Sequence, residues 1–498
     1  MVFRKDHRIG LNRERKGGKL KKTEKQTMNK MGTLPVPRLM MNMGLPIILS
    51  MVLQACYNII DSMFVAQMPD MDGIAHTGEY AVNALTLAFP IQMLIVAFGI
   101  GTGVGVNALL SKSLGQKNRE KVAYAAGNGV TLGGIIYVVF LLFGLFGIDT
   151  YLESQAKDTI ILSMGKTYLR ICTFLSLGII LFSIYEKLLQ STGKTIYSTI
   201  AQIAGALTNI VLDPILIFGW LGFPQMGVAG AAYATVIGQM VSMLAAMYFH
   251  YRKNTEVQSG WSYLKLDASV VKEIYTVGFP AIIMQALMSV MTYGVNIIFG
   301  AVSTAAVTAY GIFYKVQQFI FFAGFGLRDA ITPIVAFNYG MGNQERVKQA
   351  RFYGIFYTEV IMLAGTIVLQ VFATPLTALF GLSVETAKLC VLAMHIISIG
   401  FLCAGANIAL QGIFQALGCG ISSLVISLLR LLIVVLPLAY LFSRMENATF
   451  LIWLAFPIAE AAACVVAIGL LVRANHCLIN KMPAGQKSGK VAEVVEVS

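Results

Sequence analysis

Residues 45–66 read LPIILSMVLQACYNIIDSMFVA, an apolar stretch that is long enough to cross a membrane and yet contains an aspartate, Asp61. A helix of about 20 apolar residues crosses the roughly 30 Å of hydrocarbon in a bilayer. Similar stretches recur along the whole chain. We expect twelve spans, at residues 45–66, 81–110, 122–147, 168–190, 198–218, 227–249, 274–299, 306–338, 352–373, 389–417, 422–441 and 450–471.

The composition agrees with a membrane protein. Of the 498 residues, 57% are hydrophobic and only 12% are charged, with a mean hydropathy of +0.73. Soluble domains carry about 25% charged residues, so a soluble fold is excluded. The seven cysteines have no CxxC spacing and predict neither a disulfide framework nor a metal site. The sequence therefore predicts an all-α integral membrane protein, for which we expect no cofactor.

The positive charge of the chain is placed unevenly. If both termini lie on one side of the membrane, 29 of the 37 lysines and arginines fall on that side. Cytoplasmic segments carry such an excess, so we expect cytoplasmic termini in a multi-pass protein of the plasma or inner membrane. The net charge of +13 follows this topology, so it does not indicate nucleic-acid binding. Basic residues near the N-terminus are expected to lie close to anionic membrane lipids.

The second half of the chain repeats the first. The corresponding segments are GLP (44–46) and GFP (278–280), LGQKNREK (114–121) and MGNQERVK (341–348), and QSTG (190–193) and QALG (415–418). Two sets of six spans in the same orientation predict two lobes related by a pseudo-two-fold axis along the membrane normal, as in alternating-access transporters. The expected units are an N-terminal tail (1–43), an N-lobe (44–249), a cytoplasmic linker (250–272), a C-lobe (273–472) and a C-terminal tail (473–498).

Two spans each carry a carboxylate where hydrocarbon is expected. Asp61 lies in the first span and Asp213 in the fifth, both at about the same depth. An ionised carboxylate in a spanning helix costs roughly 2.5–3.5 kcal/mol on an insertion scale, so such groups usually bind a proton, a cation or a cationic substrate. The alternative for Asp213 is structural, because it could bond backbone groups that Pro214 frees.

Polar neighbours share the helix faces of these two aspartates. Gln54, Asn58 and Asp61 are spaced at i, i+4 and i+7, and Asn209 precedes Asp213 by four residues. Thr235 in the sixth span falls near the depth of Asn209. The oxygens of Asp61, Asn209, Asp213 and Thr235 suit sodium. They equally suit a proton that two crowded carboxylates share.

A substrate cavity is expected from adaptable side chains. Met284, Met288 and Met291 recur at helical spacing in the seventh span, and methionine binds bulky apolar cations loosely. The polar candidates for the same cavity are Gln54, Asn296 and Gln411.

Six other charged groups that fall within or at the ends of spans carry a structural expectation. Arg430 and Glu460 lie at comparable depths and are expected to form a structural ion pair. Arg328 and Asp329 are adjacent, so each is expected to need a partner on another helix. Glu186 is expected to lie at the membrane interface, together with the neighbouring Lys187.

The order of these motifs resembles multidrug and toxic compound extrusion (MATE) transporters over nearly all of residues 35–472. The matching elements are the GLP opening with Asp61 fifteen residues after Pro46, the loops GQKNRE and GNQERV, Asn209-x3-Asp213-Pro214, the segment GVAGAAYAT (227–235), and QSTG with its echo. The resemblance implies two six-helix lobes and export of organic cations in exchange for protons or sodium ions. The chain carries acids in spans one and five and none in the middle of spans seven and ten. This pattern resembles the DinF-like branch of the family.

Other functions fit the sequence less well. A flippase of lipid-linked oligosaccharides should hold several cations in its first lobe, whereas spans one to six contain only Arg170 and Lys187, both near span ends. An enzyme is not expected, because the chain has no paired His/Asp metal set and no Ser–Lys dyad. The exported compound, the coupling ion and the oligomeric state stay open.

Overall fold

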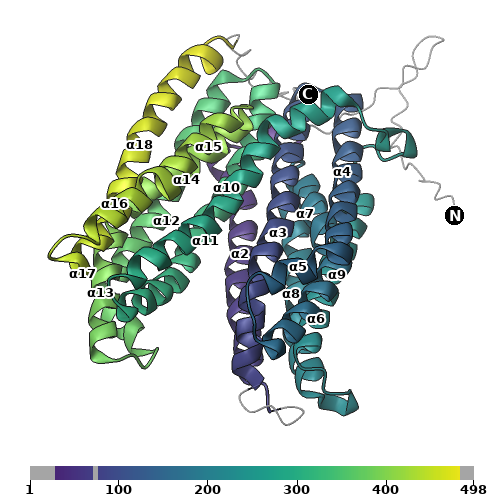
Figure 1. Cartoon of the computed structure of the whole chain (residues 1–498). Helices are drawn as coiled ribbons and strands as arrows, with labels where there is room; N and C mark the ends of the chain where they lie inside the picture. Colours follow the sequence, from purple (N-terminus) through teal and green to yellow (C-terminus); the bar gives the residue numbers. More distant parts are fainter. Residues whose placement is uncertain (1–28, 71–76, 483–498) are drawn as a thin grey trace, which may run out of the picture.

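The computed structural model describes residues 29–70 and 77–482, and these form helices joined by short loops (Figure 1). The first half contains α1 (Lys30–Thr33), α2 (Val36–Ala66), α3 (Thr77–Gly115), α4 (Arg119–Phe146), α5 (Ile148–Glu153), α6 (Thr159–Phe174), α7 (Leu177–Gln190), α8 (Thr195–Phe218) and α9 (Val228–Lys253), with the short helices η1 (Trp220–Gly222) and η2 (Trp261–Leu264). The second half contains α10 (Ala268–Gly300), α11 (Thr304–Gly340), α12 (Gln344–Ala378), α13 (Val384–Ser398), α14 (Phe401–Ala416), α15 (Gly420–Leu428), η3 (Leu429–Ile433), α16 (Val435–Phe442), α17 (Ala448–Leu451), η4 (Ile452–Leu454), α18 (Ala455–Ala474) and η5 (Asn475–Ile479).

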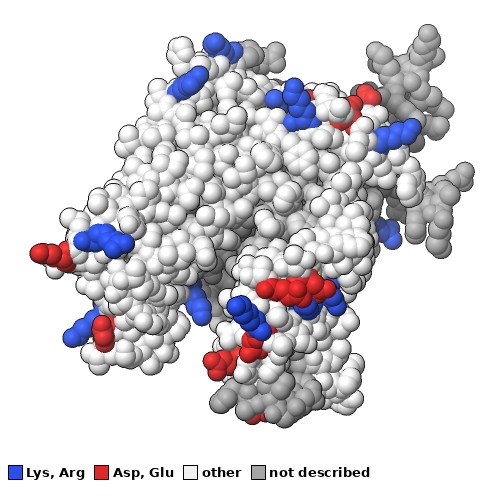
Figure 2. Space-filling model, viewed as in Figure 1, with Lys and Arg blue, Asp and Glu red and all other residues white. Residues whose placement is uncertain are grey.

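The helices are arranged in two lobes that converge at one end and separate at the other (Figure 1). We call these the closed end and the open end. The N-lobe contains α2–α9 and the C-lobe α10–α18. Figure 2 shows the hollow between the lobes at the open end, and a broad band without charged residues across this face of the molecule. The prediction of an all-α protein with two lobes is confirmed.

Ten described helices are long and apolar enough to span a membrane, and two bent pairs bring the number to twelve. The fourth and tenth spans, predicted at residues 168–190 and 389–417, are each broken into two helices. The fourth consists of α6 and α7, bent by 44°, and the tenth consists of α13 and α14, bent by 54°. The two breaks are offset by 224 residues, close to the spacing between the QSTG and QALG segments. The bend is therefore a feature of the duplicated unit.

The lobes meet through backbone contacts that require glycine. A Cβ atom at Gly105 of α3 would lie 2.1 Å from the carbonyl oxygen of Ile274 in α10. A Cβ atom at Gly340 of α11 would lie 2.0 Å from the carbonyl oxygen of Lys112 in α3. Small residues allow membrane helices this close approach. The glycine-rich segment of α3 therefore packs the two lobes together.

The segment around α1 is bonded to both lobes at the closed end. The Asn29 amide donates to the Thr192 carbonyl (3.3 Å) and to Glu256, both in the N-lobe half of the chain. The guanidinium of Arg346, at the start of α12, donates to the carbonyls of Met31 (2.9 Å) and Leu34 (2.8 Å). These bonds connect the two lobes through a third segment.

Candidate functional site

Helices α2 and α8 position the two aspartates inside the N-lobe. Close packing of α8 on α9 is possible because Gly205 has no side chain: a Cβ atom there would lie 1.9 Å from the Ser242 hydroxyl and 2.4 Å from the Gly238 carbonyl. This packing buries the polar face of α8, so Asp213 is fully buried. Asp61, which α2 presents to the same region, is partly exposed.

The two carboxyl groups meet. Asp61 and Asp213 lie within hydrogen-bonding reach of each other. The Asn209 amide nitrogen donates to Asp213 Oδ1 over 3.2 Å. Two carboxylates repel at this range, so the contact is attractive only when one of them carries a proton. The arrangement can therefore bind and release a proton.

Several oxygens around this pair have no donor. Asp61 Oδ1, Asn209 Oδ1 and Asp213 Oδ2 are buried without a hydrogen-bond partner in the described part of the chain. Leaving a buried polar atom unsatisfied costs about 1–3 kcal/mol. All three atoms are acceptors, and a proton or a hard cation such as sodium would satisfy them. The residues present thus fit the coupling ion that the sequence predicts. We call Asp61, Asn209 and Asp213 the acidic cluster.

The structure does not bring every predicted residue to this cluster. Asn58 is exposed. Thr235 is half-buried on α9, and no hydrogen bond joins it to either aspartate within the described residues. Gln54 accepts a 2.7 Å hydrogen bond from Gln202 Nε2.

The sequence prediction does not include three neighbours of the cluster. Tyr57 interacts electrostatically with both aspartates, and the Gln92 amide donates to the Tyr168 hydroxyl over 3.1 Å beside Asp61. Tyr57 precedes Asp61 by four residues, so helical spacing could have identified it. No pattern marked Gln92 or Tyr168, because they come from other helices.

A cavity that is partly open to solvent lies mainly in the C-lobe. It includes Met284, Met288, Met291 and Gln411 of the predicted substrate residues. Asn296 is exposed and lies outside this lining, and Gln54 belongs to the N-lobe. The aromatic part of the wall consists of Tyr310, Tyr314, Phe321, Phe322, Phe325 and Phe456.

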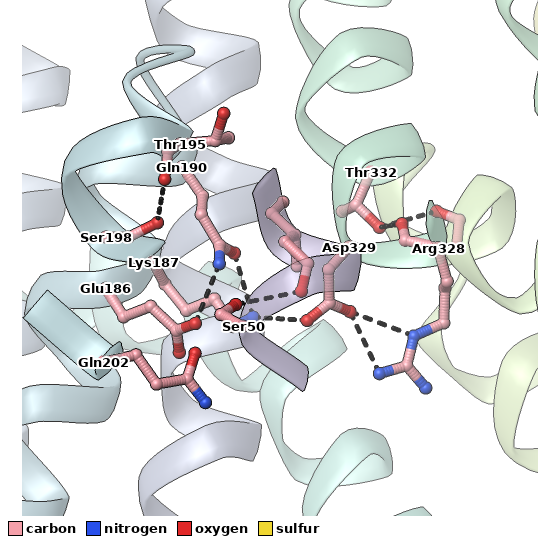
Figure 3. Close-up of polar contacts among 12 residues, drawn as sticks. Ser50, Glu186, Lys187, Gln190, Thr195, Ser198, Gln202, Arg328, Asp329 and Thr332 are labelled. Atoms are coloured by element: carbon pink, nitrogen blue, oxygen red, sulfur yellow. Dashed lines mark hydrogen bonds and ion pairs between the residues drawn. The ribbon is translucent and has the colours of Figure 1, made fainter. Parts of the chain in front are cut away.

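A buried ion cluster joins the lobes beside this cavity (Figure 3). Lys187 Nζ of α7 lies 2.5 Å from Asp329 Oδ2 of α11, and both side chains are at most 5% exposed. Arg328 donates to Asp329 Oδ1 from Nε (3.1 Å) and Nη2 (3.0 Å). On the other side, Gln190 accepts from Lys187 (2.9 Å) and donates to Glu186 (2.9 Å).

This cluster corrects two expectations. Glu186 and Lys187 do not lie at the membrane interface. They are buried between helices, where α11 of the other lobe covers them. Arg328 needs no partner on another helix, since its long side chain folds back onto the neighbouring Asp329. The predicted pair of Arg430 and Glu460 is confirmed, with an N–O distance of 2.6 Å.

Comparison with known proteins agrees with this architecture. The MatE family profile matches residues 46–215 and 280–441. The multidrug export protein MepA of Staphylococcus saprophyticus is 26% identical over 433 residues, which cover 87% of this chain and 92% of that protein. MepA of Staphylococcus aureus strain MSSA476 is 26% identical over 445 residues, covering 88% and 94%.

Two solved structures share the fold. A multidrug resistance MATE family transporter in an outward-facing conformation superposes with a TM-score of 0.84 at 23% identity, covering 93% of this chain and all of that one. A MOP superfamily transporter from Pyrococcus furiosus gives a TM-score of 0.82 at 24% identity, with 93% and 100% covered. With the family profile matching more than half of its residues, the chain belongs to the MatE family.

Proposed function

We propose that this protein is a secondary active multidrug transporter that exports organic cations in exchange for protons or sodium ions. The observation that carries the proposal is the acidic cluster, in which two carboxyl groups meet among buried oxygens that lack donors. The names of the MepA relatives, which are multidrug export proteins, support the same function.

We also propose the orientation in the membrane. The closed end contains the basic loops around residues 112–121 and 346–351, which the distribution of lysine and arginine assigns to the cytoplasm. The termini would then be cytoplasmic, in the plasma or inner membrane, and the described conformation would be open to the outside. The proposed boundaries of the units remain those given above: 1–43, 44–249, 250–272, 273–472 and 473–498.

In this scheme an ion from outside reaches the acidic cluster through the partly exposed Asp61. Binding of the ion satisfies oxygens that otherwise lack partners, and so it changes the relative stability of the outward-open and inward-open states. Substrate occupies the cavity that the methionines and aromatic rings line, where a cation can lie over ring faces. The N-lobe presents acceptors rather than several cations, which favours export of cations over flipping of a pyrophosphate-linked lipid.

The test is efflux of a fluorescent cationic dye from liposomes that contain the purified protein. A pH gradient alone and a sodium gradient alone are applied in separate experiments. Efflux driven by one gradient identifies the coupling ion, and efflux driven by neither contradicts the proposal. Asp149→Asn serves as the control, because Asp149 lies in an exposed group of ion pairs with Lys166 and Arg170.

A further inference from the structure

A basic pocket lies at the closed end of the N-lobe, apart from the cavity in the C-lobe. It is formed where the α1 segment meets the loop between α7 and α8 and the end of α9. Of the described residues that line it, three are lysines (Lys30, Lys194 and Lys253) and one, Glu256, is acidic. Three positive charges therefore face one negative charge, and the pocket attracts anions.

The carboxylate of the pocket forms no close ion pair with these lysines in the described part of the chain. Glu256 accepts a hydrogen bond from the Asn29 amide, and it attracts Lys30 and Lys194 at longer range. The ammonium group of Lys194 donates to the carbonyl of Lys253. Each ammonium group has three N–H donors, so the lysines keep donors for an incoming ligand.

The positive charges are also crowded. Burial lowers the pKa of Lys30, and the Lys194 ammonium lowers it further. Burial and the Lys253 ammonium likewise lower the pKa of Lys194, against an opposing effect of Glu256. An anion between the ammonium groups would favour their charged forms and relieve the repulsion.

The backbone around the pocket suits a phosphate. Gly193 has a φ of +79°, and a Cβ atom there would lie 2.8 Å from Cε of Lys30, so only glycine lets the Lys30 side chain lie across this loop. Lys194 is the N-cap of α8, and no side chain caps this helix. An uncapped helix N-terminus has unpaired N–H groups and partial positive charge. Phosphate groups bind at such helix ends.

An apolar strip continues from the pocket along α8. Ile196 lines the pocket, and the exposed side chains of Ile200, Leu207 and Val211 follow it at intervals of four, seven and four residues. These intervals place all four side chains on one face of the helix. Because α8 is long and apolar enough to span the membrane, this face is available to acyl chains. A phosphate that carries acyl chains therefore matches both the pocket and the strip.

We propose that this pocket binds an anionic phosphate group, held by Lys30 and Lys194. The group belongs either to a phospholipid headgroup, whose acyl chains would lie along α8, or to a soluble phosphate; the apolar strip favours the lipid. The inference does not depend on the proposed export function.

A bound phosphate would also hold α1 in place. Lys30 belongs to α1, and the carbonyl of Met31 in the same helix accepts a hydrogen bond from Arg346 of the C-lobe. A phosphate between Lys30 and Lys194 replaces their mutual repulsion by attraction to a shared anion. Its binding therefore stabilises the contact of α1 with both lobes at the closed end.

The test uses three probes on the purified full-length protein in detergent: dioctanoyl phosphatidylglycerol, dioctanoyl phosphatidylcholine and inorganic phosphate, at matched ionic strength. A ligand that binds the folded state raises the midpoint of thermal unfolding in proportion to its occupancy. The dependence of the midpoint on probe concentration gives an apparent Kd. The wild type should bind phosphatidylglycerol more tightly than phosphatidylcholine, whose choline group brings a positive charge to the lysines.

Four variants separate the pocket from the general positive charge of the protein. Lys30→Gln and Lys194→Gln should each raise the apparent Kd for phosphatidylglycerol about tenfold, since each loses a charge-assisted contact with the phosphate. Glu256→Gln should lower it, because it removes the negative charge of the pocket. Lys348→Gln removes an exposed lysine near the start of α12 at the same end and should match the wild type.

Pocket-dependent binding of phosphatidylglycerol with weak binding of inorganic phosphate would support the site and assign it to a lipid. Pocket-dependent binding of inorganic phosphate would support the site and assign it to a soluble phosphate. Equal affinity of the wild type for the two lipids, without binding of inorganic phosphate, would overturn the proposal. The same apparent Kd in Lys30→Gln, Lys194→Gln and Lys348→Gln would also overturn it, and dye efflux would be unaffected by either result.

The effect on α1 has its own readout. Met31 is fully buried, so Met31→Cys in a background without native cysteines reacts with a water-soluble maleimide only when α1 separates from the lobes. A saturating concentration of the probe that binds should slow this reaction, and adding Lys194→Gln should abolish the slowing. A labelling rate that the bound probe does not change would overturn the link between the pocket and α1.

Discussion

At the residue scale, the two asparagines near the aspartates differ in burial and should differ in effect. Asn209→Ala removes the 3.2 Å hydrogen bond to Asp213 and should reduce ion-driven dye efflux about tenfold, in line with about 1.5 kcal/mol for a hydrogen bond to a charged group. Asn58→Ala should keep at least half of the wild-type rate, because this side chain is exposed. Initial efflux rates in matched liposomes measure both. Equal losses in the two variants would place Asn58 in the site.

The sequence predicts Asp61, Asn209 and Asp213 because a carboxylate or an amide is conspicuous in an apolar span. It predicts Asn58 with them because Asn58 shares a helix face with Asp61. The exposure of Asn58 shows that helical spacing alone does not decide which part of a wide polar stripe faces the interior. The prediction for Lys187 is wrong for a related reason, because a position near a helix end does not reveal that the other lobe covers it.

At the element scale, the position of α8 depends on its contact with α9. Gly205→Ala places a methyl group against the Ser242 hydroxyl and the Gly238 carbonyl, so the two helices must separate. Overpacking of this kind costs about 1–3 kcal/mol. We expect a lower midpoint of thermal unfolding together with slower transport. The control is Gly134→Ala on α4, where a Cβ atom meets nothing within 4 Å, and an unchanged midpoint for Gly205→Ala would refute the packing argument.

The bends in spans four and ten show what the apolar pattern leaves undetermined. Hydropathy alone predicts one span in each case, and neither break contains proline. At Gly400 the second break brings α13–α14 against α18, where a Cβ atom would lie 2.8 Å from Pro457. A tertiary contact of this kind is set by segments distant in the sequence. The equivalent offset of both breaks could nevertheless have been found by searching for the repeat.

At the scale of the whole molecule, Lys187 and Asp329 hold the closed end together. Lys187→Met leaves Asp329 with Arg328 alone and removes the ion pair between the lobes; breaking a buried pair costs about 3–5 kcal/mol. Leu114 packs against hydrophobic clusters of both lobes, so a cysteine there reports opening. In a background without native cysteines, Leu114→Cys should react with a water-soluble maleimide about tenfold faster when Lys187→Met is added.

The comparison for this prediction is Lys166→Met, which breaks an exposed ion pair with Glu153 and should leave the labelling rate unchanged. A rate that Lys187→Met does not alter would show that the ion pair has no part in closing this end. The repeat in the sequence predicted the two lobes. It could not predict this ion pair, because Lys187 and Asp329 are not at corresponding positions of the two halves.

The central claim is that the acidic cluster carries the coupling ion. Its most direct test is to record the internal pH of liposomes with a trapped indicator while dye moves through the protein. If protons are the ion, the wild type should move protons opposite to the dye, and Asp61→Asn and Asp213→Asn should each lose this flux while the folded protein still inserts. If sodium is the ion, the same loss should appear in sodium flux measured with a trapped sodium indicator. Coupled ion flux at the wild-type level in both variants would contradict the account.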